Sequence, residues 1–251
     1  MIKVTLKDGS SIEVKENSTI LDVAKQISEG LARVATCGEI DGEVKDLRYE
    51  ITKDCNLTIH TFDSSLDGKK AYWHTTSHIM AQAVKRLFPG VKFAIGPSID
   101  NGFYYDFDVE KPFTDEDKEK IEAEMKKIIK ENLPIERFVL PKDEALKLME
   151  GQPYKQELIN DLPEGEEIGF YKQGDFTDLC AGPHLVSTGK VKAIKILSSS
   201  GAYWRGDEHN KMLQRIYAIS YPKASQLEEY LQFLEDAKQR DHRKIGKEME
   251  L

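Results

Sequence analysis

Four side chains with catalytic or metal-binding chemistry occur as two pairs with the same spacing. The stretch "HTTSH" places His74 and His78 four residues apart, and "DLCAGPH" does the same for Cys180 and His184. Imidazole and thiolate groups bind zinc, and near pH 7 imidazole can also position or deprotonate water. One such pair is common by chance, but these two hold three of the six histidines in the chain. Three interpretations are therefore open: unrelated residues, a zinc site, or a hydrolytic pocket without metal.

The zinc interpretation has enough donors but no known catalytic motif. His74, His78, Cys180 and His184 could supply four tetrahedral ligands. "HTTSH", however, lacks the glutamate of the H-E-x-x-H metalloprotease motif, and the zinc-deaminase pattern is absent as well. Zinc remains an alternative at this point.

Cys180 could act as a nucleophile, line the pocket or bind a ligand. A nucleophilic role needs a thiolate and usually a covalent intermediate. Because Gly182-Pro183 breaks any helix, we expect Cys180 and His184 to lie on a tight turn at the end of a strand. Binding and catalytic residues are common in such loops.

The two histidines of "HTTSH" must be positioned by a helix, which we expect from about Tyr72 to Phe88. On a helical wheel Trp73, Met80, Val84 and Leu87 lie on one side, and His74, His78 and Lys85 lie on roughly the opposite side. The pattern thus predicts that both histidines share the polar face of one helix.

Residues 1–62 predict a small separate unit. Two strands, "MIKVTL" and "SIEV", flank the hairpin turn Asp8-Gly9, a helix follows from Ser18 or Thr19 to about Gly30, and short strands follow near Val34, Val44 and 57–62. A ββαβ order suits one helix packed across a small mixed sheet. This unit contains no catalytic set.

The remaining elements alternate between strands and amphipathic helices. A linker is expected at 63–70. Strands are expected at "VKFAIGP", "GFYYDFDV", "IGFYK", "KAIKIL" and "LQRIYAISY", and helices from Thr114 to Pro134, near 142–150 and 154–161, and from Pro222 to about Lys238. The last residues, "RKIGKEMEL", are charged and predict no closing element.

Composition narrows the class of protein. The 251 residues are 39% hydrophobic and 32% charged, with a formal net charge of −8. No apolar run is long enough for a membrane span, no signal peptide is recognisable, and three scattered cysteines predict no disulfide framework. We expect a reduced, cytoplasmic protein without a membrane partner. The acidic balance argues against a generally basic nucleic-acid binder, although a local basic cluster could still contact phosphates.

Five blocks make the chain recognisable: "HTTSHIMAQAVKRLFP", "AIGPSIDNGFYYDFD", "DLCAGPH", "GAYWRGDEHNKMLQRIYAIS" and "RDHRKIGKEMEL". Together, and in this order, they resemble bacterial threonyl-tRNA synthetases over the full length of the chain. The resemblance implies an α+β protein in three parts. These are a ubiquitin-like β-grasp TGS domain (1–62), a larger α+β editing domain with a mainly antiparallel sheet (63–225), and a linker helix (226–251) leading to a synthetase core that this sequence lacks.

The function implied by the resemblance is proofreading. Serine is smaller than threonine by one methyl group, and a pocket discriminates such a difference by only about 1–3 kcal/mol. A second site that admits the smaller product would hydrolyse the ester of seryl-tRNA(Thr) to serine and free tRNA. The alternatives are a zinc-dependent aminoacyl-tRNA hydrolase and a non-catalytic tRNA-binding appendage of the ligase.

The resemblance also implies the site residues. Lys155 and Asp178 would join His74, His78, Cys180 and His184 as the catalytic set. Lys155 and His74 would hold and activate water, while Asp178 and the remaining groups would fix the seryl moiety and the terminal ribose. Tyr104, with Gly96 and Pro97, would form the wall beside the adenosine or the amino-acid side chain.

The implied cofactors and partners follow from the same family. Editing would need no cofactor, whereas ATP and zinc would belong to the absent core. The partner would be the acceptor end of tRNA(Thr) carrying serine, and the full-length enzyme would be a homodimer. A basic set near the C-terminus could contact tRNA phosphates or simply be solvated: Lys223, Lys238, Arg240, Arg243 and Lys244.

Overall fold

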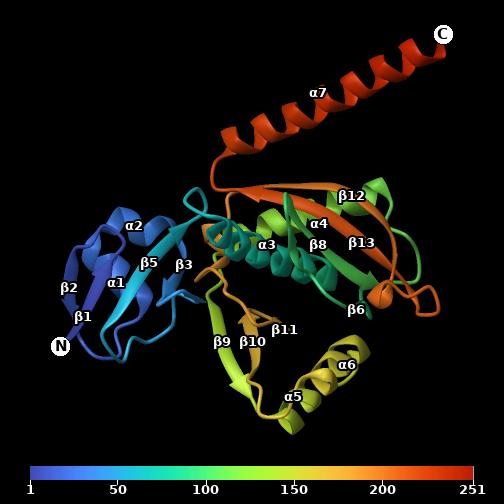
Figure 1. The fold of residues 1–251 in the computed structure, drawn as a ribbon. Coiled ribbons are helices and arrows are strands. Elements are labelled where there is room, and N and C mark those ends of the chain that lie inside the picture. Colours follow the sequence, from blue (N-terminus) through green and yellow to red (C-terminus); the bar gives the residue numbers. More distant parts are fainter. Residues whose placement is uncertain (251) are drawn as a thin grey trace.

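The computed structural model describes residues 1–250. Figure 1 shows an N-terminal unit at one side, a larger central body and a long C-terminal helix that extends away from both. The arrangement is α+β with largely antiparallel sheets, which confirms the predicted fold class.

The N-terminal unit is built on a five-stranded mixed sheet in the order β2-β1-β5-β3-β4. Its elements are β1 (Ile2–Leu6), β2 (Ser11–Val14), α1 (Ile20–Ile27), α2 (Glu29–Val34), β3 (Ala35–Ile40), β4 (Glu43–Lys45) and β5 (Cys55–Thr61). β1 and β5 pair in parallel, and the other pairs are antiparallel. Helix α1 buries Ile20, Val23 and Ala24 against the sheet. The β-grasp prediction is thus confirmed.

Two details of this unit differ from the prediction. The segment after Thr19 forms two helices instead of one, because Ser28 is extended and its hydroxyl caps α2 by accepting from the backbone N–H of Leu31. Val34, expected in a strand, is the last residue of α2.

Helix α3 (Leu66–Leu87) is the central element of the body. It begins earlier than predicted, inside the expected linker, because the Ser65 hydroxyl accepts from the N–H of Gly68 and caps it. It is also buried on nearly every side from Ala71 to Val84, so the face that carries the histidines is not a solvated one. The indole N–H of Trp73 donates to the carbonyl of Ser220, and this bond fixes the helix against the sheet.

A five-stranded antiparallel sheet covers α3, with the order β12-β13-β8-β6 and β7 paired to β8. Its strands and neighbouring helices are β6 (Lys92–Phe93), β7 (Ser98–Ile99), β8 (Gly102–Asp108), α4 (Asp115–Glu131), η1 (Thr188–Lys190), β12 (Ala193–Tyr203), η2 (Trp204–Gly206) and β13 (Met212–Tyr221). Phe103, Tyr105 and Phe107 of β8 pack with Ile79 and Met80 of α3 in the main hydrophobic core. Helix α4 begins after Thr114, as predicted, and Thr114 and Asp117 form a capping box there.

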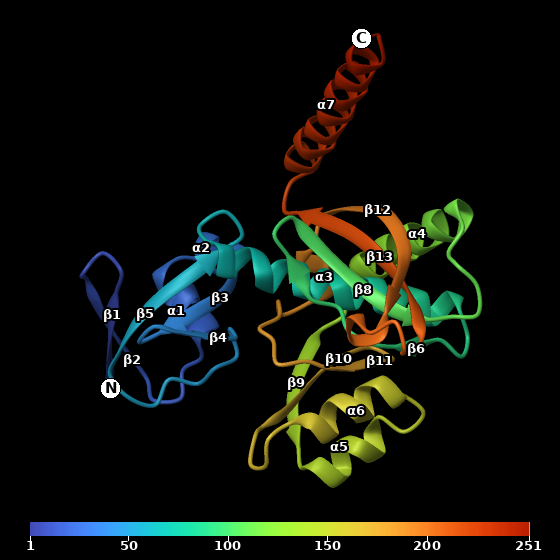
Figure 2. The same cartoon turned by 45° about the vertical axis from the view of Figure 1, so that its right-hand side comes forward.

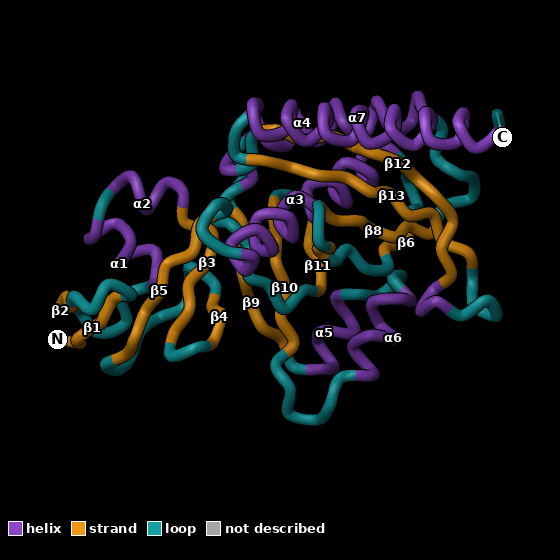
Figure 3. Tube along the Cα trace, turned by 45° about the horizontal axis from the view of Figure 1, so that its top comes forward, coloured by secondary structure: helices purple, strands orange, loops and turns teal. Residues whose placement is uncertain are grey.

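A third, three-stranded sheet lies beside the N-terminal unit, as Figure 3 shows. Its strands, in the order β11-β10-β9, and the two helices near it are β9 (Ile135–Leu140), α5 (Lys142–Leu148), α6 (Pro153–Asp161), β10 (Ile168–Gln173) and β11 (Phe176–Leu179). Figure 2 shows α5 and α6 side by side below β10 and β11. Strands β9 and β11 were not predicted, because they are short and only partly buried.

Helix α7 (Ala224–Met249) continues past Lys238, where the apolar pattern ends, and includes most of the charged stretch "RKIGKEMEL", in agreement with the linker helix that the resemblance implies. None of its residues is fully buried, although Leu227 and Tyr230 rest against the main core. None of the described helices combines the length and apolar character needed to cross a membrane.

Candidate active site

Six side chains from four segments, one of which is α3, come together in the central body. His74 and His78 come from α3, Lys155 from α6, Asp178 from β11, and Cys180 with His184 from the loop that follows β11. The structure therefore brings together all six residues that the resemblance implies as the catalytic set, although they span more than a hundred positions in the sequence.

A buried ion pair forms one half of the site. Lys155 Nζ lies 2.8 Å from Asp178 Oδ1, and both residues are 2–3% exposed. The other carboxylate oxygen accepts from the Tyr105 hydroxyl at 2.6 Å and lies 3.5 Å from His78 Nε2. Burial opposes ionisation of Asp178. The charges of Lys155 and His78 and the hydrogen bonds from Lys155 and Tyr105 outweigh it and hold the pKa of the carboxyl below its usual range.

Tyr105 is fixed as a hydrogen-bond donor in this network. Burial first, and then the neighbouring Asp178 charge, raise the pKa of its phenol far above the ordinary value. The tyrosine expected at the site was its neighbour Tyr104. Side-chain alternation along the strand carried the signal, because Tyr105 shares a face with the apolar Phe103 and Phe107.

Cys180 and two imidazoles form the other half of the site. Cys180 Sγ lies 3.2 Å from His184 Nε2 and 3.7 Å from His74 Nε2. It also accepts from the backbone N–H of Gly182 at 3.3 Å. The ring of His184 lies 4.3 Å from that of His78 and 5.2 Å from that of His74, measured between centroids. His78 thus links the cysteine side of the site to Asp178.

The imidazoles of His74 and His184 are neutral near pH 7. Burial lowers the pKa of His74 to about 4, with Asp178 opposing and Lys155 assisting this shift, even though part of the ring reaches solvent. Burial also lowers the pKa of His184 far below its usual value, and the nearby His78, His74 and Arg48 act in the same direction. A neutral imidazole retains a lone pair, so His74 can accept a proton from water.

The "DLCAGPH" loop has the predicted turn, and its glycine is required there. Gly182 has φ of 78°, a region that favours glycine. A Cβ at this position would lie 2.0 Å from the Tyr171 hydroxyl. The loop is also tied to α3, because the N–H of Leu185 donates to Thr75 Oγ1 between the two α3 histidines.

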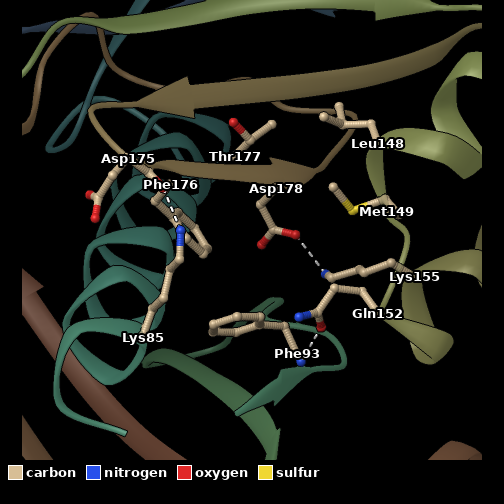
Figure 4. Close-up of a pocket in the computed structure, with 10 residues that line it drawn as sticks. All are labelled: Lys85, Phe93, Leu148, Met149, Gln152, Lys155, Asp175, Phe176, Thr177 and Asp178. Atoms are coloured by element: carbon tan, nitrogen blue, oxygen red, sulfur yellow. Dashed lines mark hydrogen bonds and ion pairs between the residues drawn. The ribbon is translucent and has the colours of Figure 1, made fainter. Parts of the chain in front are cut away.

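A cavity of about 220 Å³ opens on the ion-pair side of the site. Figure 4 shows Asp178 and Lys155 pointing toward each other at its wall, with Phe93 and Phe176 beside them. Met149, Leu148 and Gln152 close the side formed by the segment between β9 and α6. The cavity joins apolar walls to a charged pair, an arrangement common in small-ligand sites.

The three residues expected to bind substrate lie differently. The carbonyl of Gly96 accepts from Ser77 Oγ, and a Cβ on Gly96 would meet the Tyr105 ring at 2.1 Å, so the segment between β6 and β7 approaches the site closely. The carbonyl of Pro97 accepts from the N–H of Tyr104. The Tyr104 ring lies on the opposite face of β8 from Tyr105. There it stacks under the Arg215 guanidinium at 3.8 Å and lies 5.8 Å from the Tyr217 ring.

The geometry of the site can be compared with that of a zinc site. Donor atoms of His74, Cys180 and His184 all lie within 4.8 Å of one another, and ligand atoms around tetrahedral zinc are about 3.5 Å apart. His78, the expected fourth ligand, points instead to Asp178. A zinc-bound histidine usually donates its other ring N–H to a fixed acceptor, but the buried His184 Nδ1 has no partner among the described residues. Three donors therefore fit a metal, whereas the surroundings of His184 do not.

The low pKa of His74 makes stability depend on pH. Its imidazole titrates near 6.5 when unfolded and at about 4 when folded, so between these values the unfolded chain binds a proton that the folded protein excludes. We expect the free energy of unfolding to fall on the order of 1–2 kcal/mol from pH 7 to pH 5, with His184 adding to the loss. Urea unfolding at several pH values measures this. His74→Gln should flatten the dependence, and equal stability at pH 5 and 7 would contradict a neutral histidine pair.

Comparison with known proteins gives two domain matches. The family model of the TGS domain matches residues 2–61. The family model of the second additional domain of threonyl- and alanyl-tRNA synthetases matches residues 168–217, which include Asp178, Cys180 and His184.

Similar proteins were found along the whole chain. The threonine–tRNA ligase of Acetivibrio thermocellus is 65% identical over 253 aligned residues, which cover 100% of this chain and 40% of the ligase. That of Caldanaerobacter subterraneus subsp. tengcongensis is 62% identical, and that of Clostridium perfringens is 60% identical; each alignment covers 99% of this chain and 39% of the ligase. The chain thus spans about two-fifths of the length of these curated relatives.

Proposed function

We propose that this chain, a relative of the N-terminal region of threonine–tRNA ligases, hydrolyses the ester of seryl-tRNA(Thr). It carries a TGS domain and a second additional domain of threonyl- and alanyl-tRNA synthetases. The activity would be the proofreading step of such a ligase. Because threonine and serine differ by one methyl group, a first pocket separates them by only about 1–3 kcal/mol. A second pocket that excludes the larger side chain adds the missing discrimination.

The observation that supports this proposal best is the junction between the Lys155–Asp178 pair and the imidazole cluster. Hydrolysis of an ester needs a positioned water, a base for its proton and positive charge near the developing oxyanion. The neutral His74 provides a base, and Lys155 provides a positive charge that is kept in place by Asp178. The water attacks the ester carbonyl, the bond to the ribose oxygen breaks, and serine and tRNA leave.

The other residues would hold the substrate. Asp178, with an ionised carboxylate, can accept from the seryl ammonium or hydroxyl group. His78 Nε2 lies 3.5 Å from Asp178 Oδ2, and Cys180 lies between His74 and His184. We assign Cys180 to the lining of the pocket or to proton relay, since direct attack by water needs no covalent intermediate. Gly96 and Pro97 would wall the substrate. Tyr104 would contact the substrate only from the face of β8 opposite to Tyr105.

The proposal also includes a partner, a cellular location and an oligomeric state. The acceptor end of tRNA(Thr) carrying serine is the proposed partner, in the cytoplasm, and the whole ligase would be a homodimer. The basic residues Lys238, Arg240, Arg243 and Lys244 are exposed on α7 and can reach phosphates without rearrangement. The editing step itself requires no cofactor.

A deacylation assay tests the proposal against a non-catalytic role. The chain is mixed with radiolabelled seryl-tRNA(Thr), and both bound tRNA and released serine are measured. We expect serine release well above the spontaneous rate, with repeated turnover. Binding of tRNA with no serine release above the background would support a tRNA-binding appendage instead.

Removal of metal tests the zinc-dependent rival, which the three clustered donors favour. We expect protein dialysed against a chelator to retain its deacylation rate and to contain far less than one zinc per chain. The physical reason is that the proposed charge near the oxyanion comes from Lys155. Loss of activity on chelation, followed by recovery with added zinc, would establish the rival mechanism.

A further inference from the structure

The N-terminal unit reaches into the site through the segment that follows β4. The backbone N–H of His184 donates to Asp46 Oδ2 at 3.1 Å. The hydroxyl of Tyr171, on β10, donates to the same oxygen at 2.7 Å. The other Asp46 oxygen accepts from the backbone and guanidinium of Arg48, at 2.9 and 2.7 Å. One carboxylate from the N-terminal unit therefore holds a site residue of the central body by its backbone.

Arg48 binds the carbonyl groups of the same loop. Its guanidinium donates to the carbonyl of Leu185 at 2.8 Å, to that of His184 at 3.2 Å, and to that of Ile135 at the start of β9. The planar fork of arginine suits such a set of fixed acceptors. Both the N–H and the C=O of His184 are therefore bound by side chains of the N-terminal unit.

Tyr171 carries the contact from the backbone of the loop to the imidazole. Its ring stacks on that of His184 with a centroid distance of 4.0 Å, and its hydroxyl bond to Asp46 fixes the ring. Burial and the Asp46 charge raise the pKa of Tyr171 well above its ordinary value, so the phenol stays a donor. Gly182 lies directly against this hydroxyl.

We propose that Asp46 and Arg48 are positioning residues of the hydrolytic site, so that the N-terminal unit forms part of the scaffold that orients His184 and Cys180. This inference rests on the proposed function for its catalytic consequence. Site groups must be held within about 0.5 Å of their working geometry, and a shift of about 1 Å can cost as much as 100-fold in rate. The two residues touch neither the cavity nor the Lys155–Asp178 pair, so their effect passes through the loop.

Deacylation by full-chain variants tests the catalytic consequence. We expect Asp46→Ala and Arg48→Ala to lower kcat by about tenfold or more while KM changes less than about threefold. Asp46→Asn keeps an acceptor for His184 and Tyr171 and should lose less than Asp46→Ala. The matched controls are Glu43→Gln and Lys53→Ala, two exposed positions of the same unit, which should keep the normal rate.

Alkylation of cysteines by iodoacetamide, followed by peptide mass spectrometry, gives a readout that needs no deacylase activity. Asp46→Ala should raise the alkylation rate of Cys180 by about threefold or more, because its loop is no longer held. Cys37 and Cys55 are buried in the N-terminal unit, and their unchanged rates would indicate that this unit is still folded. If they react faster, Tyr171→Phe, which leaves the N-terminal unit intact, decides the question by the same two readouts.

The outcomes separate the two proposals. Normal kcat and normal Cys180 reactivity in Asp46→Ala, Arg48→Ala and Tyr171→Phe would overturn the positioning role. A wild-type chain that does not hydrolyse seryl-tRNA(Thr) would overturn the proposed function. In that case the Cys180 rates alone decide whether the N-terminal unit positions the loop.

Discussion

Replacement of Lys155 by methionine is expected to lower the free energy of unfolding by about 3–5 kcal/mol and to abolish deacylation. Methionine fills nearly the same volume but leaves the Asp178 carboxylate, which is 2% exposed, without its cation. Removal of one member of a buried ion pair is costly because the remaining charge is neither solvated nor paired. Urea unfolding measures the loss of stability, and serine release from seryl-tRNA(Thr) measures the loss of rate.

A second substitution separates the structural from the catalytic part of this effect. In the Lys155→Met background, Asp178→Asn removes the uncompensated charge and should recover part of the stability without any recovery of activity. Lys172→Met is the matched control, since Lys172 is exposed on the neighbouring strand β10. A Lys155→Met protein as stable and as active as this control would show that the pair is dispensable.

Replacement of His74 by alanine is expected to reduce the deacylation rate by about 100-fold or more while the fold is retained. Its low pKa, about 4, leaves the ring neutral and able to accept the proton of an attacking water throughout the physiological range. His74→Gln should lose a similar factor, because an amide can hold water by hydrogen bonds but cannot take up a proton. Single-turnover deacylation at saturating protein measures both.

His209→Ala is the control for this substitution. His209 is an exposed histidine whose ring contacts Asp207, and it should leave the rate unchanged. If the His74→Ala and His74→Gln proteins kept the rate of the His209→Ala protein, a different group would have to activate the water.

The sequence predicted the pairing of the site residues better than their surroundings. A spacing of four in "HTTSH" places two histidines on one face of a helix, and Gly182-Pro183 requires a turn, so both local geometries follow from the chain itself. The polar character of that helix face was wrong. A helical wheel cannot reveal that a distant loop, from 180 to 184, packs against this face, which leaves His78 buried and His74 only partly exposed.

Long-range pairing accounts for the rest of what could not be predicted. Strand β11 has only four residues and β9 is half exposed, and their pairing with β10 gives no strong pattern in sequence. Asp46 and Arg48 occur in an ordinary polar turn, and their partners lie more than a hundred residues away: Asp46 accepts from the N–H of His184, and Arg48 donates to the carbonyls of His184 and Leu185. Helix α7 continues to Met249 because its charged residues favour helix, although no core contact marked its end.

The selectivity of hydrolysis tests the central claim most directly. The measurement is kcat/KM of the wild-type chain for seryl-tRNA(Thr) and for threonyl-tRNA(Thr), under the same conditions and against the spontaneous rate of each ester. We predict fast hydrolysis of the seryl ester and a preference of at least about tenfold over the threonyl ester, the factor that exclusion of one methyl group can supply. Equal rates for the two esters, or no rate above the spontaneous one, would contradict the account.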